Sequence, residues 1–271
     1  MAECHSVAVA GLGSIGMRVA KALDQGIEGL QLKAVALRDV TTATARLSGL
    51  RSSPAILPLS ELPVAADIVV ECLPPSAFLE LGNAMLNHGG KRFVVASVGQ
   101  LLIAEGFLDA VRAADLAILV PSGAVTGLDG LRAAREIGLE AVTLKTSKPP
   151  HSFGDSVRIG DTIVAASEIK EPTRLFSGSA RQSIAAFPKN INVAATVALA
   201  GFGADRTSVE IWADPGIALN THELTIRSRG GKIRAVSENL PDADNPKSSA
   251  ITAYSIIAAL RRMESAVSLG S

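Results

Sequence analysis

Three glycines follow an apolar run near the start of the chain, in the order Gly11-Leu-Gly13-Ser-Ile-Gly16. The run from Ser6 to Ala10 has the composition of a buried parallel strand, and Ser14 to Leu23 carries apolar residues at helical spacing. The bare G-x-G-x-x-G pattern is a weak signal. A strand before it and a helix after it supply the context that its mechanism needs. We therefore predict a strand–turn–helix unit whose turn lets a ligand approach the backbone.

Each glycine of this turn has its own predicted role. Gly11 permits the tight turn, Gly13 lets the backbone approach a pyrophosphate, and Gly16 allows close packing of the helix on the sheet. The helix begins with Ser14 and Ile15, and its N-terminus supplies amide donors and the positive end of the helix dipole. The segment is predicted to bind a dinucleotide.

The first 120 residues alternate strand-like and helix-like segments. Helical patterns around Phe78 to Leu86 and Ile103 to Ala113 separate the last three strand-like runs. Aromatic residues make up only 3% of the chain, so the core must be aliphatic. Parallel neighbours need crossover helices, so this alternation favours a Rossmann-type doubly wound parallel sheet. Its further strands are predicted at Leu32 to Leu37, Asp67 to Leu73, Phe93 to Ser97 and Leu116 to Val120.

After Pro121 apolar and polar residues alternate, which is the pattern of a half-exposed antiparallel strand. We predict an α+β domain with an open, mostly antiparallel sheet, a hairpin turn at Arg229 to Gly231, and helices near Arg181 to Ala186 and Ile191 to Ala200. Its strands are predicted at Ala141 to Ser147, Asp161 to Ser167, Ser208 to Asp214, His222 to Ser228 and Gly231 to Ser237.

The predicted domains are residues 1–120 for dinucleotide binding and 121–240 for catalysis and dimerisation. Residues 241–271 hold a C-terminal helix, Ala250 to Arg261, predicted to pack back on the first domain.

Charge gives no reason to expect a nucleic-acid or membrane partner. Lys plus Arg and Asp plus Glu each number 26, and no run of five or six like charges occurs. The N-terminal segment lacks a basic region followed by an uninterrupted apolar stretch, and we expect a cytoplasmic protein. The sequence shows no metal-ligand cluster and no nucleophile motif, so we expect no metal.

The choice between NAD and NADP stays open. NAD-specific sites place an acid about 20 residues after the fingerprint to bind the ribose hydroxyls. Here Arg38 and Asp39 follow the second predicted strand; Asp39 can bind the ribose, and Arg38 can pair with a 2′-phosphate. The loop at Leu73 and Pro74 follows another strand, and ligands lie beyond the carboxyl ends of such strands, so we expect it beside the nicotinamide half of the cofactor.

Histidine is the natural proton carrier for this chemistry, because its ordinary pKa lies near working pH. Nicotinamide takes or gives the hydride, so the protein must orient the substrate and manage one proton. Of the four histidines, only His222 begins a predicted strand in the second domain, where it can face the first. We therefore select His222 as the candidate catalytic residue, although a single histidine is more often structural.

Several segments together resemble the L-aspartate dehydrogenase family. They run from the fingerprint to the C-terminal helix and so cover nearly the whole chain, and FPKNINVAA with NTHEL downstream is more specific than any glycine motif. The segments are Pro121 to Ala124, Gly127 to Ala134, Gly178 to Gln182, Phe187 to Gly201, Asn220 to Leu224 and Asn245 to Ser249.

This resemblance implies reversible, NAD(P)-dependent oxidation of L-aspartate to iminosuccinate, which water hydrolyses to oxaloacetate and ammonia and which can feed pyridine nucleotide biosynthesis. It implies that His222 is the active-site residue and that Ala124 and Asn190 contact the dinucleotide. It also implies a Rossmann domain followed by an α+β domain whose open sheet face supports a homodimer.

Two departures from the family pattern bear on substrate preference. Val125-Thr126 stands where Ile-Gly is expected, and Gln182 stands where an acid is common. A dicarboxylate also needs cations, and Lys189, Arg181 and Lys148 are unranked candidates.

Three alternative functions can be compared with this sequence. A sugar or inositol dehydrogenase would carry a glutamate before Lys148-Pro149, and a dihydrodipicolinate reductase would carry a paired-histidine segment. A dinucleotide-binding sensor without turnover is the alternative outside enzymes, and the intact NTHEL segment disfavours it.

Overall fold

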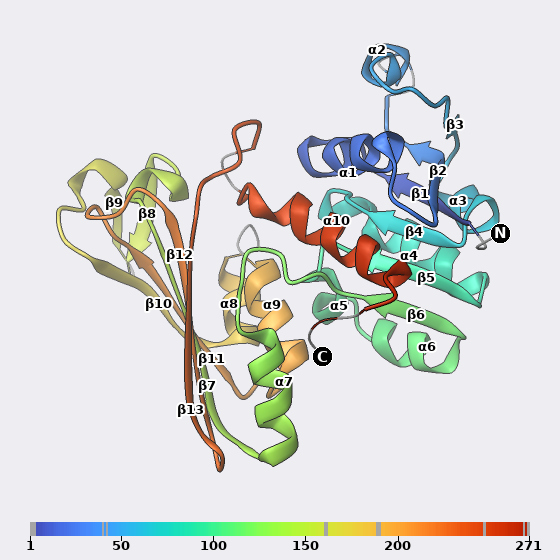
Figure 1. Ribbon diagram of the computed structural model, residues 1–271. Helices are drawn as coiled ribbons and strands as arrows, with labels where there is room; N and C mark the ends of the chain where they lie inside the picture. Colours follow the sequence, from blue (N-terminus) through green and yellow to red (C-terminus); the bar gives the residue numbers. More distant parts are fainter. Residues whose placement is uncertain are drawn as a thin grey trace. The chain divides into compact units, whose positions relative to one another are not determined.

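Two compact units make up the chain, and each has its own sheet (Figure 1). Unit 1 contains Met1–Pro121 and Ala253–Ser268, and unit 2 contains Ser122–Thr252 and Leu269–Ser271. The computed structural model describes residues 4–39, 41, 43–159, 162–187, 191–245, 248–267 and 269.

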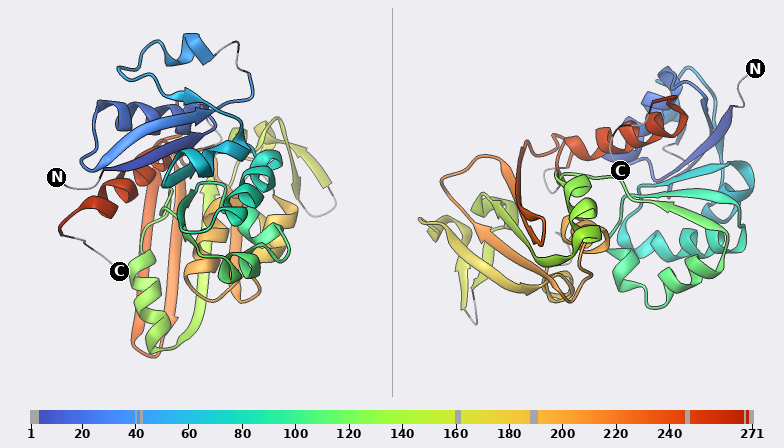
Figure 2. Two further views of the ribbon diagram at one scale, coloured as in Figure 1. Left: turned by 90° about the vertical axis from the view of Figure 1, so that its right-hand side faces the viewer. Right: turned by 60° about the horizontal axis from the view of Figure 1, so that its bottom comes forward.

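Unit 1 is built on a parallel sheet of order β3-β2-β1-β4-β5-β6. Its central strands are continuous runs of Val, Ile and Ala that are buried on both faces, as parallel strands between two helical layers must be (Figures 1 and 2). The strands are β1 (His5–Ala10), β2 (Leu30–Ala36), β3 (Ala55–Ile56), β4 (Ile68–Glu71), β5 (Lys91–Val95) and β6 (Leu116–Leu119).

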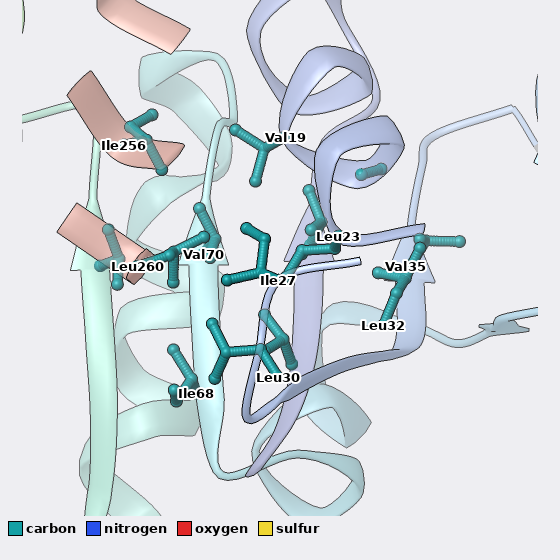
Figure 3. Close-up of a cluster of buried hydrophobic side chains, with 14 of the residues drawn as sticks. Val19, Leu23, Ile27, Leu30, Leu32, Val35, Ile68, Val70, Ile256 and Leu260 are labelled. Atoms are coloured by element: carbon teal, nitrogen blue, oxygen red, sulfur yellow. The ribbon is translucent and has the colours of Figure 1, made fainter. Parts of the chain in front are cut away.

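The helices of unit 1 include one from the far end of the chain. Ile256 and Leu260 of α10 (Ile251–Glu264) belong to the same aliphatic core as Val19, Leu23 and Val70 (Figure 3). The C-terminal helix therefore completes the covering of this sheet. The remaining helices are α1 (Ser14–Gln25), α2 (Ala43–Leu47), α3 (Leu62–Ala65), α4 (Phe78–Asn87), α5 (Gln100–Ile103) and α6 (Phe107–Ala113), with 3-10 turns η2 (Leu59–Glu61) and η3 (Pro75–Ala77).

Unit 2 contains a five-stranded sheet of order β10-β11-β7-β12-β13. All its pairings are antiparallel except that of β11 with β7, so the sheet is mixed and mostly antiparallel. A separate hairpin follows the η4 turn (Pro150–Phe153) and joins β8 (Ser156–Ile159) to β9 (Thr162–Ala165), and the η5 turn (Ala166–Glu168) follows it. The sheet strands are β7 (Leu139–Lys148), β10 (Thr173–Ser179), β11 (Thr207–Ala213), β12 (Asn220–Ser228) and β13 (Gly231–Asn239).

Helices cover one face of this sheet (Figure 1). They are α7 (Leu128–Ile137), α8 (Ala180–Ala186) and α9 (Ile191–Ala200). Alternate residues of the central strands point to them, so Leu144 and Val142 of β7 lie opposite Leu224 and Ile226 of β12, and all four are buried.

The predicted fold class is confirmed, and the differences in detail have local causes. The helix predicted from Ile103 to Ala113 begins only at Phe107, as α6, because Ile103 ends the preceding helix α5 and Gly106 before α6 has a left-handed φ of 73°. Of the strand predicted from Asp161 to Ser167, Asp161 lies outside the described residues, Thr162–Ala165 form β9, which pairs with β8, and Ala166 and Ser167 belong to the η5 turn. The sheet also contains β10, which was not predicted because a bulge between Arg174 and Phe176 interrupts its period-two pattern.

Candidate functional site

The glycine turn lies between β1 and α1, as predicted. Gly11 has a left-handed φ of 89°, and a Cβ there would lie 2.5 Å from the carbonyl oxygen of Cys72. A Cβ on Gly16 would overlap the carbonyl oxygen of Gly11. Both positions therefore exclude any side chain for reasons internal to the protein.

Gly13 differs from these two glycines. Its φ is −73°, which any residue adopts, and a Cβ there would meet no protein atom within 4 Å. It also occupies the N-cap position of α1, which has no side-chain hydrogen bond to the helix amides. Uncapped amides beside an open backbone fit a pyrophosphate, so the residues present are compatible with a bound dinucleotide.

Two arginines and an acid are candidates for contact with the adenosine end of the dinucleotide. Arg46 of α2, which the sequence analysis did not select, donates from Nη1 to the carbonyl oxygen of Leu12 at 2.7 Å. Asp39 accepts hydrogen bonds from the backbone N–H and the hydroxyl of Thr41, at 3.0 and 2.6 Å, and Arg38 is exposed. An exposed arginine and an acid thus follow β2 next to each other.

Glu71 is a second residue that sequence reasoning missed. It ends β4, its side chain is fully buried, and its two oxygens accept four hydrogen bonds. The donors are the backbone N–H of Leu73 at 2.7 Å, of Ala96 at 3.1 Å and of Ser97 at 2.8 Å, and the hydroxyl of Ser97 at 2.9 Å. The carboxylate therefore joins the carboxyl ends of β4 and β5.

The loop predicted to border the nicotinamide begins at one of these donors. Leu73 is half-buried and Pro74 is exposed.

Burial raises the pKa of Glu71, and the hydrogen bonds from Ser97 and Leu73 oppose that shift. A lone acid at the end of an aliphatic strand was the available sequence signal, because such a charge must be heavily hydrogen-bonded to be buried.

His222 lies on β12 in unit 2 and is 4% exposed. It pairs with Thr146 of β7 in the register, and its Nδ1 lies 3.0 Å from the Thr146 hydroxyl oxygen. Among the described residues, Nε2 has no hydrogen-bond partner. Burial and, second, the charge of Lys148 lower the pKa of His222 from 6.5 to about 3. The imidazole is therefore neutral near pH 7.

Lys148 lies two residues beyond Thr146, on the same face of β7, and is 7% exposed. Burial lowers the pKa of Lys148 from 10.5 to about 8, so the ammonium stays mostly charged at pH 7. The neighbouring strand β12 begins at Asn220, which is 1% exposed. Its Oδ1 accepts no hydrogen bond from any residue in the described part of the chain.

These side chains belong to what we call the polar row. The row crosses the helix-covered face of the unit 2 sheet at one end, beyond the aliphatic part of that face. It consists of Thr146, Lys148, Asn220, His222, Ser237 and Asn239.

Ala124 lies beside the polar row. Its carbonyl oxygen accepts hydrogen bonds from Ser237 Oγ at 2.8 Å and from Asn239 Nδ2 at 2.9 Å. Ser237 in turn pairs with His222 in the register of β12 and β13. Two residues selected in the sequence, Ala124 and His222, are thus brought together, whereas Asn190 lies outside the described residues.

The candidate cations for binding a dicarboxylate, Lys148 and Arg181, differ in burial and in their partners. Arg181 is exposed and forms a bidentate ion pair with Asp205, at 2.6 and 2.9 Å. Lys189 lies outside the described residues. Gln182, one of the departures from the family pattern, completes a capping box with Ser179 at the start of α8. An acid could make the same bonds there, so the substitution preserves the helix cap.

Two features are absent from the described residues. No group of three or more His, Cys, Asp or Glu side chains has a metal-binding arrangement there. No helix among these residues combines the length and the apolar character needed to cross a membrane.

The strand order of unit 1, with a glycine fingerprint after its first strand, defines a dinucleotide-binding protein of the Rossmann class. Residues 11–121 match the model described as homoserine dehydrogenase, NAD binding domain, and residues 129–263 match aspartate dehydrogenase, C-terminal. The chain is 43% identical to L-aspartate dehydrogenase of Bradyrhizobium diazoefficiens, over 98% of this chain and 94% of the relative. The chain belongs to the L-aspartate dehydrogenase family.

Further similarities agree with this assignment. L-aspartate dehydrogenase 3 of Bordetella bronchiseptica is 40% identical, over 98% of this chain and 97% of the relative. The crystal structure of aspartate dehydrogenase from Thermotoga maritima superimposes with a TM-score of 0.75 at 28% identity, covering 98% of this chain and 99% of that one. Both domains therefore have counterparts in one solved protein.

Proposed function

We propose that this protein is an NAD(P)-dependent L-aspartate dehydrogenase that oxidises L-aspartate to iminosuccinate, reversibly. Similarity over almost the whole chain to relatives of that name supports the proposal. The observation that carries it is local: His222, a buried and neutral imidazole, is held through Nδ1 by Thr146 in the polar row. The chemistry needs a base of this kind to accept a proton.

The pyrophosphate of the dinucleotide is proposed to bind in unit 1. Gly11, Gly13, Ser14, Ile15 and Gly16 hold the pyrophosphate at the uncapped end of α1, where Gly13 leaves the backbone open.

At the nicotinamide half the proposed contacts are Leu73, Pro74, Ala124 and Asn190. Arg38 or Asp39 contacts the adenosine ribose, depending on whether it carries a 2′-phosphate. When bound, the nicotinamide accepts the hydride that leaves Cα of L-aspartate.

His222 manages the proton. Oxidation of an amine to an imine removes a hydride from carbon and a proton from nitrogen, and the neutral imidazole is the base that accepts this proton. With Nδ1–H donating to Thr146 Oγ1, Nε2 keeps its lone pair for the substrate. In the reductive direction the protonated imidazole returns the proton. Burial disfavours free imidazolium, so this form depends on the nearby substrate carboxylates.

The test is the absorbance of reduced nicotinamide on addition of L-aspartate to enzyme with NAD⁺ or NADP⁺. D-aspartate, L-glutamate and L-alanine serve as competing substrates. His222→Gln should lower kcat/KM by about 10²–10⁴-fold, the usual contribution of a general base. The exposed His151 gives the matched control, His151→Gln, which should leave kcat/KM within about 2-fold.

Two results would contradict this proposal. Turnover of another amino acid in place of L-aspartate would overturn the substrate assignment. Dinucleotide binding without turnover of any of the four amino acids, or of oxaloacetate with ammonium, would favour the sensor function.

We also propose a homodimer formed through the open face of the unit 2 sheet. This face presents Lys145 over the ring of Trp212, with the ammonium 4.7 Å from the ring centroid, and an ion pair between Arg234 and Glu223 at 2.9 Å. Val236 is 48% exposed on the same face, opposite Glu223 in the register. Light scattering should give twice the 27.9 kDa chain mass, and Val236→Lys should reduce it toward the monomer mass.

A further inference from the structure

Lys148 is the buried cation of the polar row. It is 7% exposed, whereas Arg181 is exposed and its guanidinium is engaged by Asp205. Burial of an ammonium is unfavourable unless an opposite charge or several acceptors compensate for the lost water. Burial lowers the pKa of Lys148 to about 8, and a carboxylate bound beside the ammonium would offset this desolvation.

Asn220 gives a second, independent indication that the polar row receives a ligand. Thr221 lies opposite Ser147 in the register, so the next pair places Asn220 opposite Lys148. Its carboxamide oxygen is buried and accepts no hydrogen bond from the described residues. Buried polar groups are nearly always hydrogen-bonded in native proteins, so an unpaired one next to a buried charge points to a missing partner.

Charge balance identifies the kind of partner. Near neutral pH the row contributes one positive charge from Lys148 and none from His222. L-aspartate carries two carboxylates and one ammonium, so its net charge is −1. One of its carboxylates can neutralise Lys148. Its amine is the group from which His222 is proposed to accept a proton. A carboxylate also accepts from a carboxamide NH2, which Asn220 presents when its amide group is turned over.

We propose that Lys148, assisted by Asn220, binds a carboxylate of the amino-acid substrate and thereby selects for an acidic substrate. This inference rests on the proposed L-aspartate dehydrogenase activity for its choice of ligand. It assigns Lys148 as a substrate-binding residue and Asn220 as its partner on the opposite strand.

The experiment compares Lys148→Met with Lys145→Met. Both remove one ammonium from β7, but Lys145 lies three residues earlier on the open face of the sheet, over Trp212. Lys148→Met should raise KM for L-aspartate at least 10-fold and leave KM for NAD(P)⁺ within 2-fold. Lys145→Met should leave both KM values within 2-fold. Lys148→Arg, which keeps the charge, should restore part of the lost affinity.

A second variant keeps the lysine in place. Asn220→Asp is nearly isosteric and puts a carboxylate opposite Lys148, where it competes with the substrate for the ammonium. It should also raise KM for L-aspartate at least 10-fold. Unchanged KM for L-aspartate in both folded variants would overturn the inference while leaving the proposed function intact.

Succinate, a dicarboxylate without an amine, tests binding without turnover. It should raise the Tm of the wild type and not that of Lys148→Met. If the wild type fails to oxidise L-aspartate but keeps this Lys148-dependent shift, the proposed function fails and the carboxylate site stands. If succinate raises the Tm of both proteins equally, Lys148 is not the binding residue.

Discussion

The two units each bury ionisable groups in aliphatic surroundings, but they satisfy those groups differently. In unit 1, Glu71 receives four hydrogen bonds that tie two strand ends together. In unit 2, the His222 ring has one hydrogen bond, to Thr146, and the Asn220 oxygen has none among the described residues. A buried polar group with all its partners supports the fold, whereas one with missing partners points to a ligand.

The largest effect should come from removing the satisfied group. Glu71→Leu leaves the backbone N–H groups of Leu73 and Ser97 without their side-chain acceptor, while the Ser97 hydroxyl keeps only the Leu73 carbonyl oxygen at 3.0 Å. We expect a loss of about 3–5 kcal/mol in the free energy of unfolding, measured with urea. Glu71→Gln keeps one acceptor and should lose less. A loss below about 1 kcal/mol in the unfolding free energy of Glu71→Leu would contradict the claim that Glu71 supports the fold of unit 1.

The pH dependence of stability tests the unit 2 side of the contrast. The folded-state pKa of His222 is about 3 and its unfolded value is near 6.5, so the unfolded state binds more protons below pH 6.5. Stability should therefore fall as pH falls from 6.5 toward 3. This group alone contributes up to about 2 kcal/mol of loss between pH 7 and pH 5.

Removing the titrating group supplies the comparison for this measurement. His222→Gln should unfold with a shallower pH dependence than the wild type over the same range. Parallel pH profiles for the two proteins would show that burial does not hold the imidazole neutral.

A smaller effect separates two glycines of one turn. Gly13→Ala adds a methyl group where no protein atom lies within 4 Å, so the free energy of unfolding should change by less than about 1 kcal/mol. The methyl group should obstruct the pyrophosphate and raise KM for NAD(P)⁺ by about 10-fold, equivalent to about 1.4 kcal/mol. Gly16→Ala is the contrasting variant, because its methyl group would overlap Gly11 and destabilise unit 1 itself. Unchanged cofactor KM in Gly13→Ala would contradict the placement.

Sequence patterns predicted unit 1 well because its strands are continuous aliphatic runs and its turn requires glycine. The family resemblance supplied Ala124 and Asn190, and His222 was selected both by its position at the start of a predicted strand and by the resemblance. Glu71 was missed because its four donors come from two strand ends, and the Ser97 end lies far along the chain. Pairing between distant segments is not visible in local periodicity.

Lys148 was named as a candidate but could not be ranked by sequence. A lysine followed by two prolines has the pattern of an exposed loop. Its burial arises because β11 and β12 flank β7 on both sides, so that Ala213 and Thr221 come next to the end of the strand. Strand order decides which side chains at this end are covered, and strand order is a property of the whole unit.

The most direct measurement of the central claim determines the urea unfolding free energy and kcat/KM for L-aspartate on one protein, Lys148→Met. The folded protein holds this ammonium at a net cost, because the pKa of Lys148 is lowered to about 8. We predict that the variant is about 1–2 kcal/mol more stable than the wild type and at least about 10-fold less active. Loss of stability together with activity would instead show that Lys148 supports the fold of unit 2, as Glu71 supports that of unit 1.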